Sequence, residues 1–257
     1  MKGERRKNYL FKHLYLYAGE SLGDILACNG IVHHMADKTE TLIVHANPIY
    51  KDCLECMFSD FPNILPLTQE EFKEYQKDKP SIEKIIAPGV SGMPIIFPDG
   101  SQGSAPFAWE RQHYENFDLP FSMRYKNFHM PKHIPNAQAL YEKLTEGEKD
   151  YIVVNRFMGY PMKHLGYHVD MWNPKNYKVI ELHPAITSNV FDFVELFRHA
   201  KQIHVVPTSI HQLVDSMTHE IQGELFFHNI RANFYSPVNC QFNEYRWIII
   251  DYLDKAQ

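Results

Sequence analysis

The sequence lacks any apolar run long enough to cross a membrane, and it has only four cysteines among its 257 residues. A transmembrane helix needs about 20 consecutive apolar residues. Residues 1–7 are charged and polar, and no apolar stretch typical of a signal peptide follows them. Four cysteines in a chain of this length do not form a disulfide framework. We therefore expect a reduced, cytoplasmic protein with no membrane span, for which peripheral contact with a membrane stays open.

The sequence also lacks a surplus of positive charge. Its 26 Lys and Arg stand against 31 Asp and Glu, which gives a formal net charge of −5. A protein that coats nucleic acid needs a basic surface, so we expect no nucleic-acid partner. The content of 44% hydrophobic and 22% charged residues is typical of a globular chain, and the length allows one large domain or two smaller ones.

Patterns that bind metals are scarce. Cys53-Leu-Glu-Cys56 is the only CxxC, it has no second ligand pair, and it lies inside an apparently helical stretch. We interpret its cysteines as packing residues. The 15 histidines include no HExxH motif, and the chain has no Asp-x-Asp. We therefore expect no required metal and no cofactor.

Strand and helix signals alternate in two blocks. The irregular segment 91–135 separates the blocks; it is rich in glycine, proline and aromatic residues, and within it only residues 105–116 look helical. Such alternation predicts parallel strands with crossover helices, and thus an α/β protein with two Rossmann-like halves facing across a cleft. The first half covers residues 1–135 and the second covers 136–257. Strands are expected at 14–18, 41–45, 63–67, 82–87, 150–155, 178–182, 202–206 and 224–227, helices at 24–36, 50–58, 137–144, 190–199 and 209–217, and a helix or a strand at 243–254.

A glycine-bearing turn, Gly19-Glu-Ser-Leu-Gly23, joins the first expected strand to a helix that begins near Asp24. The turn is neither a dinucleotide fingerprint nor a P-loop, but it matches the G-x-S-x-G elbow of serine hydrolases, with Ser21 as the nucleophile. Nothing upstream of this first strand supplies the second N–H of an oxyanion hole, which argues against the hydrolase. In a second interpretation, the helix N-terminus offers free N–H groups and Asp24 accepts a proton from a bound hydroxyl. In a third, Asp24 only caps its helix.

A second candidate site follows the strands of the second half. The strand at 202–206 leads into Pro207-Thr-Ser209 and then a helix, and hydroxyls at a helix N-terminus suit a diphosphate, although Thr and Ser are also ordinary N-caps. Arg156 and Arg231 each follow a strand, so both are expected at the carboxyl edge of the sheet, where ligands of open α/β sheets bind. The predicted donor-binding residues are Gly23, Asn155, Arg156, His183, Thr208, Ser209, His211 and Arg231.

The run Ser21-Leu-Gly-Asp-Ile-Leu26, with the helix after it, resembles the first strand–turn–helix of the heptosyltransferase-like (ADP-heptose:lipopolysaccharide) glycosyltransferases. Residues 203–215 and 224–231 are similar to the donor-binding end of the same proteins. Two positions differ from the family pattern: Pro207 stands where an acidic residue is usual, and Gln212 stands at the histidine position, with His211 one place earlier. The wider GT-B class, rather than an ADP-heptose donor, is therefore what the resemblance implies.

The resemblance implies a compact version of the two-domain GT-B fold, with Asp24 as the catalytic general base. It further implies an inverting, metal-independent glycosyltransferase. Such an enzyme moves a sugar from a nucleotide-diphosphate sugar to a hydroxyl of a glycan or another acceptor. Two alternatives stay open: a serine hydrolase that uses Ser21, and a catalytically silent sugar-nucleotide-binding protein of the same fold.

Overall fold

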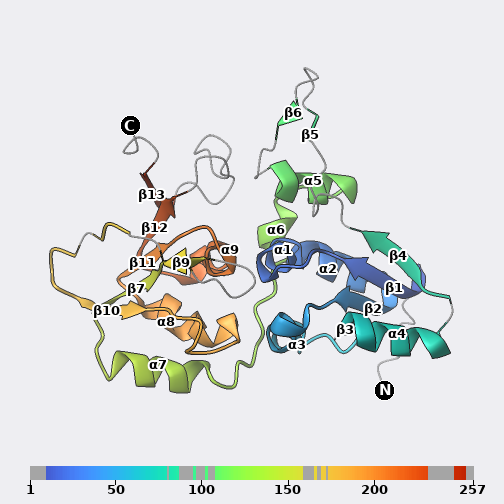
Figure 1. Cartoon of the computed structure of the whole chain (residues 1–257), viewed down its shortest axis with the longest axis horizontal. Helices are drawn as coiled ribbons and strands as arrows, with labels where there is room; N and C mark the ends of the chain where they lie inside the picture. The colour runs from blue at the N-terminus through green and yellow to red at the C-terminus, as the bar shows by residue number, and fades with distance from the viewer. Residues whose placement is uncertain are drawn as a thin grey trace, which may run out of the picture.

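The computed structural model describes residues 10–79, 81–86, 95–96, 102–103, 108–158, 165–166, 169–171, 173–230 and 246–252. Within these residues two separate parallel sheets, each with its own helices, form two lobes that lie side by side (Figure 1). We call residues 10–86 the N-terminal lobe and residues 136–252 the C-terminal lobe. Residues 108–126 form the bridge segment. The predicted boundary between residues 135 and 136 stays a prediction.

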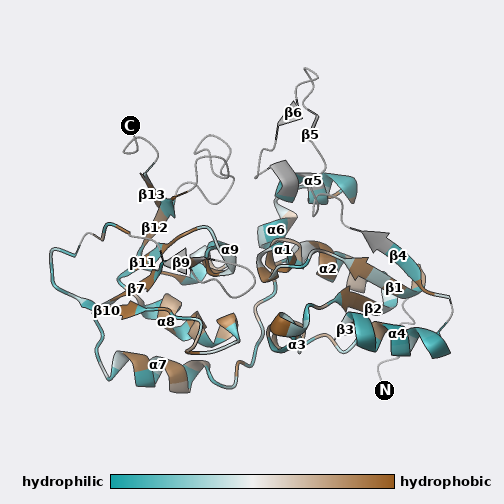
Figure 2. Ribbon diagram, in the orientation of Figure 1, coloured by the Kyte–Doolittle hydropathy of each residue, from teal (hydrophilic) through white to brown (hydrophobic). Residues whose placement is uncertain are grey.

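The N-terminal lobe contains a four-stranded sheet in the order β3-β2-β1-β4, in which all neighbours are parallel. Parallel neighbours require crossover connections, and helices supply them here. Figure 2 shows that β2 is hydrophobic, whereas the outer helix α4 is hydrophilic. The elements are β1 (Phe11–Tyr17), α1 (Leu22–Ala27), α2 (Asn29–Ala36), β2 (Thr39–His45), η1 (Pro48–Tyr50), α3 (Lys51–Met57), β3 (Ile64–Leu67), α4 (Gln69–Asp78) and β4 (Glu83–Ile86).

The first crossover differs from the sequence prediction of one helix over residues 24–36. Helix α1 begins two residues earlier, because Ser21 is its N-cap, and it ends at Ala27. Cys28 is both the C-cap of α1 and the N-cap of α2, which begins at Asn29. Asn29 and Gly30, both poor helix formers, stand at the junction. The Asn29 side chain there accepts a hydrogen bond from the backbone N–H of His129 (3.0 Å).

The sequence prediction also missed α4. Its N-terminus carries a capping box, in which the Thr68 hydroxyl accepts from the Glu71 N–H and the Glu71 carboxylate accepts from the Thr68 N–H. The pattern Thr-x-x-Glu is visible in the sequence and is a known helix start signal. The helix was therefore predictable.

The C-terminal lobe contains a five-stranded parallel sheet in the order β10-β7-β11-β12-β13. In chain order this is 2-1-3-4-5, a doubly wound arrangement. The tail that could have been a helix or a strand is strand β13. The elements are α7 (Ala137–Thr145), β7 (Tyr151–Asn155), β10 (Lys178–Glu181), η2 (Val190–Phe193), α8 (Val194–His199), β11 (Gln202–Val205), α9 (Ser209–Ser216), η3 (Thr218–Glu220), β12 (Glu224–Asn229) and β13 (Trp247–Asp251).

Shorter elements complete the described chain. Two antiparallel pairs, β5 (Ile95–Ile96) with β6 (Gln102–Gly103) and β8 (Phe157–Met158) with β9 (Leu165–Gly166), lie outside the main sheets. The bridge segment holds α5 (Ala108–Asn116), which the sequence predicts, and α6 (Met123–Lys126), which it does not. None of the helices in the described ranges is long and apolar enough to span a bilayer.

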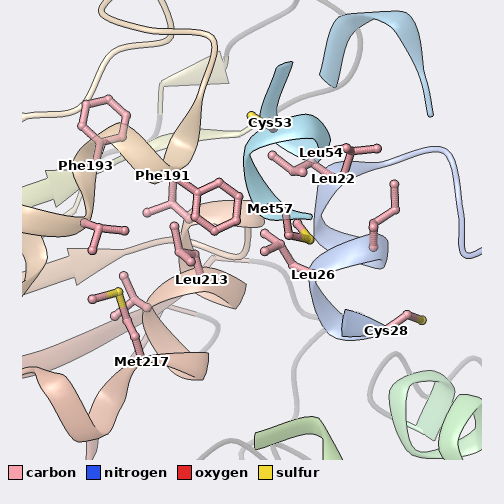
Figure 3. Packing of buried hydrophobic residues seen from close by; sticks show 14 of the residues in the cluster. Leu22, Leu26, Cys28, Cys53, Leu54, Met57, Phe191, Phe193, Leu213 and Met217 are labelled. Carbon is pink, nitrogen blue, oxygen red and sulfur yellow. The ribbon is translucent and has the colours of Figure 1, made fainter. Parts of the chain in front are cut away.

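One hydrophobic cluster extends through both lobes. Where the lobes meet, Leu26 of α1 and Met57 of α3 lie beside Phe191 of η2 and Leu213 of α9 (Figure 3). All four side chains have no exposed surface. The lobes are therefore joined by a continuous apolar core as well as by the chain between them.

A substitution at Gly30 tests how tightly the bridge segment packs on the N-terminal lobe. A Cβ at this position would lie 2.5 Å from the carbonyl oxygen of Met123, a backbone atom that cannot rotate away. Gly30→Ala should therefore lower the free energy of unfolding by about 1–3 kcal/mol, the usual cost of overpacking. Urea unfolding followed by circular dichroism measures it.

The matched control is Gly23→Ala in α1. The atoms nearest to a Cβ at Gly23 are 3.7 Å or more away, which is an ordinary contact. Alanine is also the better helix former by up to about 1 kcal/mol. This variant should be as stable as the wild type or more stable, and an equal loss in both variants would contradict the packing at Gly30.

Candidate functional site

Each sheet has one point where the strand order reverses. In open parallel sheets, ligands bind outside the carboxyl ends of the strands at this point. In the first sheet it lies at β1 and β4, and β1 runs directly into the turn at residues 19–23. In the second sheet it lies at β7 and β11, which end at Asn155 and just before Val206. The turn before Asp24, the pair Asn155 and Arg156, and the pair Thr208 and Ser209 therefore follow strands that flank the two reversal points.

The turn after β1 holds Asp24 in one orientation. Gly19 has a φ of +136°, in the region that favours glycine, and a Cβ there would lie 2.5 Å from the Cβ of Asp24. Ser21 and Asp24 form a capping box, in which the Asp24 carboxylate oxygen Oδ2 accepts from the Ser21 N–H at 3.3 Å. Asp24 is thus the third residue of α1, and its carboxylate caps the helix, as the third interpretation of this residue expects.

The environment of Asp24 raises its proton affinity. The side chain is half-buried, and burial raises the pKa of Asp24, with a smaller contribution from the charge of Glu20. The hydrogen bonds with Ser21 act in the opposite direction. A partly exposed carboxylate with a raised pKa is suited to accept a proton.

A polar chain that the sequence analysis missed lies beside this turn. The Tyr17 hydroxyl donates to Glu20 Oε1 (2.8 Å), and His45 Nε2 lies 3.4 Å from the same oxygen. Tyr15 and His45 share a hydrogen bond at 2.8 Å, and burial with the charge of Glu20 raises the pKa of Tyr15 to about 12. The strands place these groups at the carboxyl edge together with Asp24. The alternation of Tyr15 and Tyr17 along β1 was the available sequence signal.

At the second edge, Asn155 and Thr208 connect two strand ends. The Asn155 amide Nδ2 donates to Thr208 Oγ1 at 2.9 Å, and Thr208 is the N-cap of α9, where it accepts from the His211 N–H at 3.4 Å. The Thr208 hydroxyl is therefore occupied by the protein itself. Ser209, partly exposed in the first turn of α9, has its N–H near the free end of the helix.

Arg156 and His183 also lie at this edge. The Arg156 guanidinium is paired with Glu181 at the end of β10, at 2.9 Å, and the Arg156 side chain keeps 27% of its surface exposed. His183 is exposed, its Nδ1 accepts from the Ala185 N–H at 3.1 Å, and its ring packs edge-on against Phe157. An anion bound by Arg156 would compete with the Glu181 carboxylate, a partner that the sequence analysis did not identify.

One predicted donor-binding residue that the structure describes, His211, is not brought to this edge. His211 is 1% exposed, and its ring packs against Phe227 (4.6 Å between centroids) and Trp247. Burial, with the charge of Arg124, lowers the pKa of His211 to about 3, so the ring is neutral. It occupies the face of α9 that covers the sheet, which corrects its expected place at the donor edge. Arg231 lies outside the described residues.

The two edges meet where α1 contacts α9. A Cβ on Gly23 would lie 3.8 Å from the Ser209 Cα and 3.8 Å from the Gln212 Cγ. The turn that carries Asp24 therefore packs directly on the first turn of α9. Gly23, the residue before the predicted base, is therefore next to Ser209 of the predicted diphosphate cradle, although the two belong to different lobes.

The geometry around Ser21 does not support the interpretation of this protein as a serine hydrolase. The Ser21 Oγ accepts the Asp24 N–H at 3.3 Å as an N-cap, and no described histidine is hydrogen-bonded to it. A serine nucleophile needs such a base within reach. Within the described ranges no cluster of three or more His, Cys, Asp or Glu could hold a metal ion. Metal independence stays a prediction.

One cavity in the described part of the chain lies away from these residues. It has a volume of about 380 Å³ and is open to solvent. The chain before α7, α7 itself and α8 line it, and the lining includes Lys132, Glu195 and Arg198. None of the predicted site residues lines it.

Comparison of this structure with solved structures identifies the type of fold. No protein-family model matches the sequence, and a search of curated proteins finds no match either. Among solved structures, a family 9 glycosyl transferase from Veillonella parvula superposes with a TM-score of 0.55 at 7% identity, covering 96% of this chain and 88% of that one. The chain has the GT-B type of fold.

Two further solved structures are similar at lower scores. The iron-containing dodecameric glycosyltransferase TibC from enterotoxigenic E. coli has a TM-score of 0.47 at 12% identity, covering 89% of this chain and 61% of that one. The E. coli heptosyltransferase WaaC with ADP has a TM-score of 0.42 at 8% identity, covering 93% and 91%. At such identities the GT-B fold is what the likeness to the Veillonella protein shows.

The raised pKa of Asp24 has a consequence for stability. Because the folded state favours the protonated carboxyl, ionisation of Asp24 costs stability as pH rises through its raised pKa, and the cost is absent below the pKa of the unfolded chain. Asp24→Asn keeps an acceptor for the Ser21 N–H but removes the charge. The variant should melt at the same temperature as wild type or higher at pH 7, and this difference should shrink towards pH 3. Calorimetry at both pH values decides; a large loss at pH 7 would mean that the carboxylate is mainly a structural cap.

Proposed function

We propose that this protein is an inverting glycosyltransferase that moves a sugar from a nucleotide-diphosphate sugar to a hydroxyl group of a glycan or another acceptor. The observation that carries the proposal is the contact between the Asp24 turn and the first turn of α9. Three observations support the proposal: Gly23, which precedes Asp24, is next to Ser209 at the start of α9; burial raises the pKa of Asp24; and a solved structure with a similar fold is a glycosyl transferase.

In the proposed reaction Asp24 removes the proton from the acceptor hydroxyl while the acceptor oxygen attacks the anomeric carbon. The bond from that carbon to the diphosphate oxygen breaks, and its electron pair leaves with the diphosphate. Because attack and departure occur on opposite faces of the sugar, the configuration inverts. A half-buried carboxylate whose pKa is raised is a stronger base than an ordinary aspartate, which is what deprotonation of a hydroxyl requires.

The departing diphosphate needs positive charge or N–H donors. The first turn of α9 supplies free backbone N–H groups at Ser209, and the helix dipole favours an anion there. Arg156 supplies a guanidinium that can exchange Glu181 for phosphate oxygens. Asn155 and Thr208 hold β7 and α9 together at this position. We propose that these groups make a metal ion unnecessary and that the protein works in the cytoplasm.

Replacing Asp24 tests the base. Asp24→Asn should lower kcat about 10²–10⁴-fold, the usual contribution of a general base, while the affinity for the nucleotide stays unchanged. In the wild type, kcat should fall as pH falls through the raised pKa of Asp24, because the protonated carboxyl cannot accept a proton. Both effects on kcat are measured as the rate of sugar transfer, with the nucleotide sugar that a thermal-shift screen identifies. Unchanged kcat in Asp24→Asn would remove Asp24 from this role, and binding without turnover in the wild type would favour the silent sugar-nucleotide-binding protein.

Replacing Arg156 tests the donor edge. A thermal-shift screen with UDP-, GDP-, ADP- and dTDP-sugars identifies the nucleotide, because a ligand at 100 times its Kd adds about 2.7 kcal/mol of stability. Arg156→Gln should weaken binding of that nucleotide about tenfold, the loss of one charged hydrogen bond.

The matched control is Arg198→Gln. Arg198 is as exposed as Arg156 and is likewise paired with carboxylates, those of Glu195 and Glu220, but it lies in the wall of the separate cavity. This variant should bind the nucleotide as the wild type does. Equal weakening in both variants would contradict a donor site at Arg156.

A further inference from the structure

A buried ionic cluster connects the bridge segment to the C-terminal lobe. Arg124 of α6 is 2% exposed and pairs with Glu110 of α5, which is equally buried. The same guanidinium donates to the Gln212 amide oxygen and lies 3.3 Å from Asp215, both on α9. We call these four side chains the interlobe cluster.

The members of the interlobe cluster also bond to each other and to their surroundings. The Gln212 amide donates to Glu110 at 2.8 Å. Glu110 and Gln212 therefore each make two hydrogen bonds within the cluster, one with Arg124 and one with each other. The Asp215 carboxylate accepts from the Tyr125 hydroxyl (3.0 Å) and from the Trp247 indole N–H (2.9 Å). Buried charges are stable only while such partners are kept, so the cluster permits one arrangement of α9 relative to the bridge segment.

The bridge segment is fixed to the N-terminal lobe as well. The Tyr114 hydroxyl of α5 donates to the carbonyl of Ala27 at the end of α1 (2.9 Å). The Met123 carbonyl lies so close to Gly30 of α2 that only glycine fits there. The bridge segment is thus attached to α1 and α2 of the N-terminal lobe and to α9 of the C-terminal lobe.

One member of the cluster also reaches the proposed site. The Gln212 side chain, held by Arg124 and Glu110, contacts Gly23 in the Asp24 turn, with its Cγ 3.8 Å from a Cβ placed on Gly23. Gln212 stands one helical turn after Thr208 and Ser209. Whatever fixes Gln212 therefore also fixes the distance between Asp24 and the amino end of α9.

We propose that Arg124 is a positioning residue, which anchors α9 so that the base and the diphosphate cradle stay at a constant separation in one rigid body. Donor and acceptor would then meet without closure of the two lobes, because closure would pull Arg124 away from Gln212 and Asp215. This inference rests on the proposed function, in which Asp24 and α9 act on the same substrate pair.

Arg124→Lys tests the inference, because lysine keeps the charge but cannot hold Glu110, Gln212 and Asp215 together. We expect kcat to fall about tenfold to a hundredfold, as is typical of a small misplacement of reacting groups, while the KM values of donor and acceptor change less than about twofold. If Arg124→Lys does not fold, Gln212→Asn serves instead, since its shorter amide keeps its chemistry but loses this reach. Unchanged kcat in a folded variant, or a loss confined to KM, would overturn the proposal.

Cys53→Ala is the matched control for a purely structural effect. The Cys53 thiol of α3 donates to the carbonyl of Ser188 (3.0 Å) and accepts the Val190 N–H (3.4 Å), so it joins the same two lobes at a place away from the Asp24 turn. This variant should melt at a lower temperature and keep the wild-type kcat. A parallel loss of kcat in Cys53→Ala would show that any weakening of the interface slows turnover and would remove the special role of Arg124.

X-ray scattering of the free proteins separates this inference from the proposed function, because it needs no substrate. Arg124→Lys should have a larger radius of gyration than the wild type, and the wild type should not contract when the nucleoside diphosphates of the four screened sugars are added. Contraction of the wild type, or an unchanged radius in the variant, would overturn the rigid body. Absence of turnover by the wild type with every nucleotide sugar would instead refute the transferase.

Discussion

The contact between α1 and α9 is the constraint on which the arrangement of this molecule depends. Apolar side chains from both helices and from α3 and η2 fill it, and they belong to one cluster that runs through both sheets. Because that surface is apolar, separation of the lobes would expose it to water at roughly 25 cal/mol per Å². The contact therefore fixes where the turn after β1 lies relative to the turn after β11.

The strands and their order of appearance were largely predictable from the sequence, because parallel strands are buried on both faces and read as short apolar runs. The strand Tyr-Ile-Val-Val-Asn of β7, buried along its whole length, is an example. The break between α1 and α2 was not predictable in the same way. It depends on a hydrogen bond to His129 and on the approach of Met123 to Gly30, and both partners are about 100 residues away in the chain.

The candidate site was predictable where backbone geometry determines it and unpredictable where side-chain orientation does. A strand, a glycine turn and a helix place Asp24 at a sheet edge whatever the rest of the chain does. The orientation of His211 depends instead on which face of α9 meets Phe227 and Trp247. Arg124 gives no sequence signal at all, since an arginine near Lys126 reads as a surface residue until Glu110 and Asp215 are placed around it.

The backbone of Gly19 limits how this chain can diverge. Its φ of +136° and the distance of 2.5 Å to the Asp24 side chain mean that any other residue would both strain the turn and displace the carboxylate. Replacement of Gly19 in a descendant sequence would thus be tolerated most readily where the Asp24 carboxylate no longer has a function. Among proteins descended from a common ancestor, Gly19 and Asp24 should therefore be retained together or lost together.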